Sequence, residues 1–261
     1  MLAALHLGIE MSCKQLYELA GKLRVSYQKK INNTYIWSSL ARDALLMAAK
    51  NEEFLESEKL NVPTKSAGKI RRIRREKADL VELLQSAEST EFNFSIHTYI
   101  VAQVEAYLSD LVRGVLNIDK RRLKARVQGI DHVKKVDVSS IIDAESLDEI
   151  TDELIDRELI AIFYASPEKQ FEYLERVIGI EVDSKTKQLF KNWKEYKATR
   201  DLIVHNHGVV NELYIKKAGS LARAELGNQI EVTSEYIDSL VAETKSLVGR
   251  ISNSIQRANK V

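Results

Sequence analysis

The chain has 261 residues, of which 44% are hydrophobic and 30% charged, and its formal net charge is +1. This balance is typical of a globular protein that buries a sizeable core, and it excludes a disordered chain. A net charge so close to zero also excludes a surface that attracts nucleic acid everywhere, so any polyanion must be bound by a local patch.

The composition predicts an all-α fold, because two prolines and ten glycines leave few positions that interrupt helices. A single cysteine, Cys13, excludes an internal disulfide and fits a reducing compartment. No Cys/His cluster has the spacing of zinc ligands, so we expect neither metal nor cofactor. The start lacks a basic signal region, and no apolar run approaches the ~20 residues of a membrane span. We therefore expect a cytoplasmic protein with no membrane partner.

Residues 1–90 are predicted to form an N-terminal helical segment, separate from a helical bundle over residues 91–261. The segment is predicted to contain three helices, at roughly 5–31, 33–58 and 67–87. The break before the third helix is placed at Asn61-Val62-Pro63-Thr64, because proline removes a backbone donor and restrains the preceding residue.

The third predicted helix carries the basic stretch Arg71-Arg72-Ile73-Arg74-Arg75-Glu76-Lys77. A solvated helix face is the simplest interpretation of these charges. Docking of RNA or of a partner protein is the alternative.

The segment from Phe94 to Leu116 is predicted to be a core helix. Its apolar residues recur at alternating three- and four-residue steps, which stack them on one face: Val101, Val104, Leu108, Leu111 and Val115. The same helix carries two carboxylates, Glu105 and Asp110.

A basic connector follows, with a loop expected around Gly129. Between Lys120 and Asp137 it has seven basic and two acidic residues, the basic ones being Lys120, Arg121, Arg122, Lys124, Arg126, Lys134 and Lys135. Arg121, Arg122, Lys124 and Arg126 are candidates for contacts with an RNA backbone. A solvated loop is the alternative. An acidic helix from about residue 147 to 165 comes next.

Cap signals place the remaining helices. Ser166-Pro167 starts a helix that Gly179 ends, and another should begin near Asp183 or Ser184 and stop at Gly208. Residues from 209 to 230 predict a turn-rich or hairpin-like connection. The segment Val232-Thr233-Ser234-Glu235 then caps a last helix that runs nearly to the end.

The helix that follows Asp183 has an arginine in an otherwise apolar row. That row is formed by Leu189, Trp193, Tyr196, Arg200 and Ile203. A buried guanidinium without partners costs several kcal/mol. Arg200 must therefore meet a carboxylate, open into a cleft, or face another subunit.

Arg200, the polar Asp201 and His205 follow a spacing that resembles the HEPN signature. The surrounding segment from Arg200 to Asn211 resembles the form found in bacterial defence and toxin–antitoxin proteins, in particular the RiboL-PSP-HEPN group. The segment from Val104 to Leu111 resembles the first HEPN helix with its acidic residues. Residues 171–180 and 230–236 fit the same pattern, so the resemblance spans about residues 92 to 258.

This resemblance implies a HEPN-type helical bundle with an additional N-terminal helical segment. It implies a metal-independent endoribonuclease that acts as a toxin or antiphage effector, with RNA as substrate and an antitoxin or defence-system protein as partner. It also implies a homodimer in which two arginine–histidine pairs meet in a composite site. Arg200 and His205 would be catalytic, and the supporting residues would be Asp201, Asn206, Glu105 and Asp110.

The residue chemistry is compatible with this function. A histidine with an ordinary pKa of about 6.5 can take the proton of a ribose 2′-hydroxyl and return one to the leaving oxygen, while arginine binds the phosphate. On an ideal helix Arg200 and His205 lie about 140° apart. Either the helix breaks before His205, or the two residues act across a dimer.

Structural interpretations remain open for each residue. Arg200 can form a buried ion pair with Glu105 or Asp110, and His205 can be a helix C-terminal histidine favoured by the helix dipole. His207 stands where one HEPN subgroup has a modifiable tyrosine, which argues against that kind of regulation. The alternatives to a nuclease are a non-catalytic HEPN module that binds RNA or protein, and a purely structural helical dimer.

Overall fold

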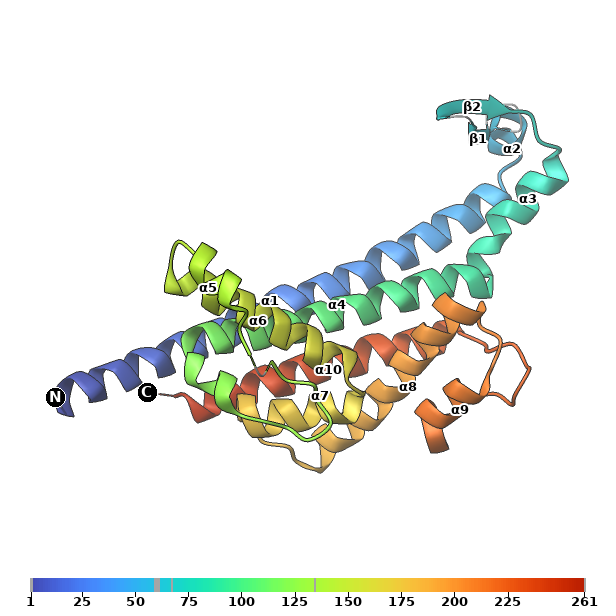
Figure 1. Ribbon diagram of the computed structural model, residues 1–261. Coiled ribbons are helices and arrows are strands. Elements are labelled where there is room, and N and C mark those ends of the chain that lie inside the picture. The colour runs from blue at the N-terminus through green and yellow to red at the C-terminus, as the bar shows by residue number, and fades with distance from the viewer. Residues whose placement is uncertain (1, 59–61, 67, 134, 261) are drawn as a thin grey trace.

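The computed structural model describes residues 2–58, 62–66, 68–133 and 135–260. Within them helices form nearly all of the regular structure, and the one sheet has two short strands, β1 (Val62–Ser66) and β2 (Lys69–Ile73) (Figure 1). The predicted all-α class is confirmed. No helix in the described part of the chain is both long and apolar enough to cross a membrane.

Four long helices form the body of the molecule: α1 (Leu2–Ala49), α4 (Thr90–Ile118), α8 (Ser184–Asn206) and α10 (Ser234–Ala258). The acidic helix α6 (Leu147–Tyr164) lies beside α4, as Figure 1 shows. The shorter elements are α2 (Glu52–Glu58), α3 (Lys77–Gln85), η1 (Ser86–Glu88), η2 (Lys120–Lys124), α5 (Val138–Asp143), α7 (Pro167–Tyr173), η3 (Leu174–Ile178), α9 (Glu212–Ala218) and η4 (Gly219–Leu221).

Helix α4 is the predicted core helix, and it packs against α1, α6, α8 and α10. Every residue of its predicted apolar stripe is at most 1% exposed: Val101, Val104, Leu108, Leu111 and Val115. Full burial of one such side chain stabilises the fold by about 1.5–3 kcal/mol. The stripe therefore makes α4 the helix around which the others are arranged.

Helix α1 is continuous, so the predicted break near residue 32 is wrong. Asn32 and Asn33 each lower helix propensity by at most about 0.7 kcal/mol, which packing easily outweighs. Ala20 and Ile31 are fully buried. The amide oxygen of Asn32 also accepts a hydrogen bond from Lys245 Nζ of α10 at 2.7 Å. Helix α1 therefore shares one core with α4 and α10.

The predicted third helix, over residues 67–87, is wrong in its first part. Residues 69–73 form strand β2, which pairs with β1 in antiparallel register, and helix α3 begins only at Lys77. Gly68 makes the tight turn between the strands with a φ of +74°, a left-handed conformation that glycine adopts at no steric cost. The basic stretch 71–77 therefore lies on a strand and a loop rather than on a helix face.

The predicted break before this segment is confirmed, since α2 ends at Glu58 and Pro63 lies in β1. Asn61, which was included in the break, lies outside the described residues. Three- and four-residue periodicity does not identify the hairpin, because the β-branched residues here fit either helix or strand when taken alone.

The predicted helix ends in the second half of the chain are confirmed. Ser146, Asp183 and Thr233 each accept a hydrogen bond at the start of a helix from a backbone N–H three residues later. Gly179 ends the predicted helix with a φ of +85°. The connection after α8 is less simple than predicted, because α9 is inserted before the chain returns to pair Val209 with Gln229.

Candidate functional site

Helix α8 positions the central residues of the site, and its start is firmly capped. Asp183 Oδ1 accepts hydrogen bonds from the backbone N–H and the hydroxyl of Thr186, at 2.8 and 2.7 Å. These bonds, together with an ion pair to Arg250 of α10, hold the pKa of Asp183 well below its ordinary value. The cap is thus an ionised carboxylate at neutral pH, which suits the positive end of a helix dipole.

At its C-terminal end, α8 is followed by two residues with positive φ, the second of which is a glycine. His207 has a left-handed φ of 52°, and Gly208 follows with a φ of 78°. A Cβ atom on Gly208 would lie 2.5 Å from Phe94 Cζ, so α4 approaches this backbone more closely than a side chain allows. The backbone of Gly208 also accepts a hydrogen bond from Ile230 N at 2.8 Å. The predicted stop at Gly208 is confirmed.

Arg200 lies where α8 meets α4, and its guanidinium is ion-paired but still partly exposed to solvent. Its Nη2 atom donates to Glu105 Oε2 at 3.2 Å, and its Nη1 atom donates to Asp201 Oδ1 at 2.9 Å. The side chain is 28% exposed. Its Nε atom has no hydrogen-bond partner among the described residues. The predicted ion pair between Arg200 and Glu105 is present.

Two lysines extend this pair into a chain of charges. Lys197 Nζ lies 3.1 Å from Glu105 Oε1, and Lys217 Nζ lies 2.8 Å from Asp201 Oδ2. Burial alone would raise the pKa of Asp201, but the hydrogen bond from Lys217 and the nearby cations lower it below its ordinary value. Because three cations alternate with two carboxylates, the cluster keeps one excess positive charge at neutral pH.

His205 lies in the last turn of α8, and its side chain is exposed. Since α8 continues through Asn206, the alternative in which the helix breaks before His205 is wrong. On a continuous helix His205 lies about 7.5 Å along the axis from Arg200 and about 140° around it. The two predicted catalytic residues of one chain therefore lie on different sides of the helix.

The remaining predicted supporting residues have other contacts. Asp110 is not at Arg200: its Oδ2 atom accepts a hydrogen bond from the Tyr27 hydroxyl at 2.6 Å and so joins α4 to α1. Burial, followed by this hydrogen bond, raises the pKa of Tyr27. Asn206 donates to the backbone oxygen of Val209 and so stabilises the turn that follows α8.

A second polar cluster lies on the inner side of α8 around Glu195, which is 4% exposed. Its carboxylate accepts hydrogen bonds from Thr199 Oγ1 at 2.6 Å, Tyr214 Oη at 3.0 Å, Arg223 Nε at 3.0 Å and Tyr236 Oη at 2.6 Å. The guanidinium carbon of Arg223 also lies 3.6 Å from the centre of the Tyr236 ring. This Glu195 cluster ties α9 and the loop after it to α8, and so fixes the chain that follows His205.

His97 of α4 lies behind the Glu195 cluster and is fully buried. Its ring stacks on Tyr236, with the ring centres 5.6 Å apart and the planes 13° from parallel. Burial, followed by the charge of Arg223, lowers the pKa of His97 to about 3. His97 is therefore neutral in the folded protein at neutral pH.

A groove between α4 and α6 opens beside Glu105, the ion-pair partner of Arg200. Glu105, Ala106 and Ser109 of α4 line one part of it, and α6 contributes an apolar wall that includes Ile160 and Tyr164. Those two side chains are 59% and 89% exposed. Because Glu105 both lines the groove and binds Arg200, a ligand in the groove would lie against the charged cluster.

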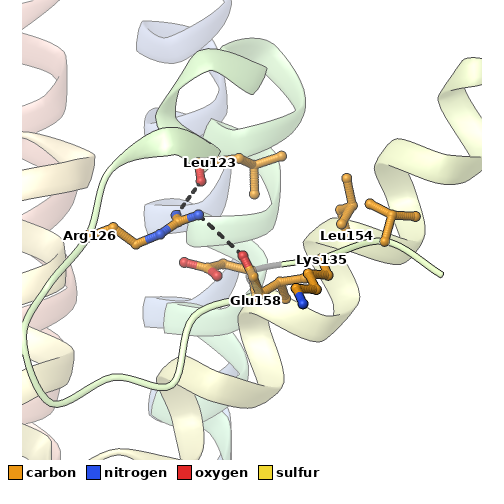
Figure 2. A pocket seen from close by; sticks show the side chains of 7 residues that line it. Leu123, Arg126, Lys135, Leu154 and Glu158 are labelled. Atoms are coloured by element: carbon orange, nitrogen blue, oxygen red, sulfur yellow. Dashed lines mark hydrogen bonds between the residues drawn. The ribbon is translucent and has the colours of Figure 1, made fainter.

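The four predicted RNA-backbone residues lie at the far end of α4. The helix rises about 20 Å between Glu105 and its last residue, Ile118, at about 1.5 Å per residue. Arg122 donates to the backbone oxygen of Ile178 at 2.9 Å. Arg126 donates to the backbone oxygens of Leu123 and Val133 at 2.7 and 3.2 Å, as Figure 2 shows beside Glu158.

Arg122 and Arg126 thus stabilise the connector itself. Arg121 pairs with Asp119 at 2.8 Å, and Lys124 is exposed. Lys134, which belongs to the same basic stretch, lies outside the described residues. The structure brings none of the four predicted RNA-backbone residues to the Arg200 cluster.

Several residues of the site were missed from the sequence. Lys197 has a detectable signal, because it precedes Arg200 by three residues and so lies on the same side of a helix. Lys217 and Arg223 have no such signal in the sequence, because each contacts α8 from a separate part of the chain. Glu195 could have been found only as a carboxylate in a helix otherwise predicted to be core.

Comparisons with known proteins add no family to this description. No protein-family model matches the chain, and neither a curated protein nor a solved structure matches it at a significant level.

Proposed function

We propose that the chain is a metal-independent endoribonuclease of HEPN type. The observation that carries the proposal is the Arg200 guanidinium, which is held by Glu105 and Asp201 yet open to solvent on the helix that ends at the exposed His205. A guanidinium matches the oxygens of a phosphate in a bidentate way, and histidine can exchange protons near neutral pH.

In this mechanism His205 takes the proton of a ribose 2′-hydroxyl, whose oxygen attacks the adjacent phosphorus. The bond from phosphorus to the 5′-oxygen breaks, and that oxygen receives a proton from the histidine. Arg200 binds the phosphate as negative charge builds on its oxygens. The products are a 2′,3′-cyclic phosphate and a 5′-hydroxyl.

The proposed active unit is a homodimer with composite sites. Within one chain Arg200 and His205 lie about 140° apart on a continuous helix, so a second copy must supply one of them at each phosphate. Exposed apolar side chains at the end of α8 and on α9 support such a contact, because Val204 and Leu213 are 50% and 56% exposed. Asn206, beside His205, would stabilise the backbone conformation at the C-terminal end of α8.

The proposed setting rests on the family resemblance. The enzyme would act in the cytoplasm as a toxin or antiphage defence effector, and an antitoxin or a defence-system protein would control it. RNA is the substrate, and the mechanism needs no cofactor.

A second candidate function is a non-catalytic HEPN module that binds RNA or protein. It is favoured by the ion pairs that Arg200 already makes, since two carboxylates compete with any phosphate for the guanidinium.

Cleavage of a labelled RNA in the presence of a chelator distinguishes the two. The nuclease proposal expects cutting by the wild type and none by Arg200→Ala or His205→Ala. If the wild type binds RNA without cutting it, the non-catalytic binding module is supported. Equal cutting by all three proteins would exclude Arg200 and His205 as the catalytic residues.

A further inference from the structure

The hairpin formed by β1 and β2, together with the loop that follows it, is strongly basic. Figure 1 shows it at the far end of α1, beyond the ends of α8 and α10. Residues 62–77 include seven basic side chains and one acidic one, Glu76; the basic ones are Lys65, Lys69, Arg71, Arg72, Arg74, Arg75 and Lys77. Lys77 begins α3 and pairs with Glu52, so residues 62–76 of a chain whose net charge is only +1 keep five excess positive charges.

The strand register places these cations on both faces of the hairpin. Successive residues of a strand point to opposite faces, so Lys69 and Arg71 share one face while Arg72 points to the other. Lys65 faces the same way as Arg72, because it pairs across the ribbon with Ile70. Lys65, Lys69 and Arg71 are exposed, and none of them forms an ion pair with a described residue.

The base of the hairpin is anchored, which gives the arm a defined direction. Ile73 packs against a small apolar cluster in which Leu55 of α2 meets Leu80 and Leu84 of α3. At the outer end the strands have no such cover, and Ile70 is 80% exposed. Lys65, Lys69 and Arg71 therefore lie on an arm that projects away from the helical bundle.

The chemistry of the hairpin favours one kind of polyanion. Residues 62–77 contain no aromatic side chain to stack on an unpaired base, and no Asn or Gln to read a base edge. Lysine and arginine on both faces instead match phosphates on either side of a groove. A base-paired helix, whose bases stack on each other and whose phosphates lie outside, fits this surface.

We propose that the β1–β2 hairpin binds the phosphate backbone of double-stranded RNA. The choice of RNA over DNA rests on the proposed function, since a nuclease that cuts RNA would use the arm to hold a paired region of its substrate. The surface is separate from the Arg200 cluster, because α4 alone rises about 22 Å from Glu105 to Thr90 before α3 and the hairpin are reached.

The test measures binding rather than cutting. Fluorescence anisotropy with the full chain carrying Arg200→Ala, which keeps the RNA intact, compares an RNA duplex with its single strand and with the DNA duplex of the same sequence. The hairpin variant is Lys69→Glu with Arg71→Glu. The matched control is Lys187→Glu with Lys191→Glu, two exposed lysines of α8 that change the net charge equally.

We expect the RNA duplex to bind most tightly and the hairpin variant to weaken it at least about tenfold. The slope of log affinity against log salt should fall by about 2, one for each lost phosphate contact, and the control should leave both quantities nearly unchanged. Lys65→Glu, on the opposite face, should weaken binding as well, and circular dichroism should show each variant folded.

Equal weakening by hairpin and control variants, or preference for the single strand or for DNA, would overturn the proposal. So would a wild type that binds no nucleic acid, which would point to an acidic protein surface as the partner. The nuclease proposal fails independently: a chain that binds the duplex through the hairpin but cuts no RNA keeps this inference and loses the other.

Discussion

Arg223 and Glu195 form an ion pair whose atoms lie 3.0 Å apart and which joins the loop after α9 to the inner side of α8. Glu195 is almost fully buried, while the Arg223 side chain is 26% exposed. The pair connects two parts of the chain on either side of His205. Its removal therefore tests how firmly the end of α8 is held.

Replacement of Arg223 by alanine should destabilise the fold by about 3 kcal/mol, because it leaves a buried carboxylate without its cation. Urea unfolding measures the change. Arg176→Ala is the control, since Arg176 is 65% exposed in a pair with Glu172 and should contribute little. Similar losses for both variants would show that the Glu195 cluster is not a special source of stability.

Glu105 and Asp110 lie on the same helix but have different partners, so they should respond differently to substitution. Glu105→Gln should lower RNA cleavage about 10- to 100-fold, because Arg200 loses the charge that orients it. Asp110→Asn should leave cleavage nearly unchanged, since Asp110 binds Tyr27. The measurement is the single-turnover cleavage rate at matched protein stability, and the reverse order of effects would contradict the assignment of Glu105.

Mixing two inactive variants tests the composite site. If Arg200 of one subunit acts with His205 of the other, a heterodimer of Arg200→Ala and His205→Ala contains one site with both residues intact. Cleavage should then reappear when the two proteins are unfolded together and refolded as a mixture. Each variant refolded alone serves as the control, and a mixture as inactive as either parent would place both residues in one subunit.

His97 should make the protein sensitive to mild acid. Its pKa is about 3 in the folded state against an ordinary value of 6.5, so between these values the unfolded chain binds a proton that the folded chain does not. Stability should therefore fall as the pH decreases below about 6.5. Unfolding measured from pH 7 to pH 5, above the range of the carboxylates, should show this loss in the wild type and less of it in His97→Leu. His205→Ala, which removes an exposed histidine instead of a buried one, is the matched control.

Gly208 and Gly227 separate two effects of a glycine with positive φ. Gly227→Ala, where a Cβ atom meets nothing within 4 Å, should cost about 1 kcal/mol from backbone strain alone. Gly208→Ala adds a collision with Phe94 and Gln229 and should cost about 3 kcal/mol. Thermal unfolding compares the two, and equal shifts would mean that Phe94 moves aside without cost.

The sequence predicts the second half of the fold well, because local signals there agree with the packing. Asp183 and Thr233 cap the helices they were expected to cap, and Gly179 ends its helix as expected. In the first half, the prediction fails where a long-range contact determines whether a helix continues. Lys245 of α10 supports Asn32, which no local pattern reveals.

The candidate site is predictable only along its own helices. The pairing of Arg200 with a carboxylate follows from the cost of burying a lone guanidinium, and Glu105 was one of two candidates. The choice between Glu105 and Asp110 depends on how α1, α4 and α8 are rotated against each other. Lys217 and Arg223 reach the site from a connection whose path the sequence does not determine.

The unbroken α1 has a consequence for any RNA that touches both the hairpin and the Arg200 cluster. Thr34 marks the level of the site on α1, because its hydroxyl accepts a hydrogen bond from Gln103 of α4 at 2.7 Å. From there to Ala49 the helix rises about 22 Å without a hinge. In the proposed nuclease, this constant separation would place the cut at a set number of nucleotides from the end of a paired region.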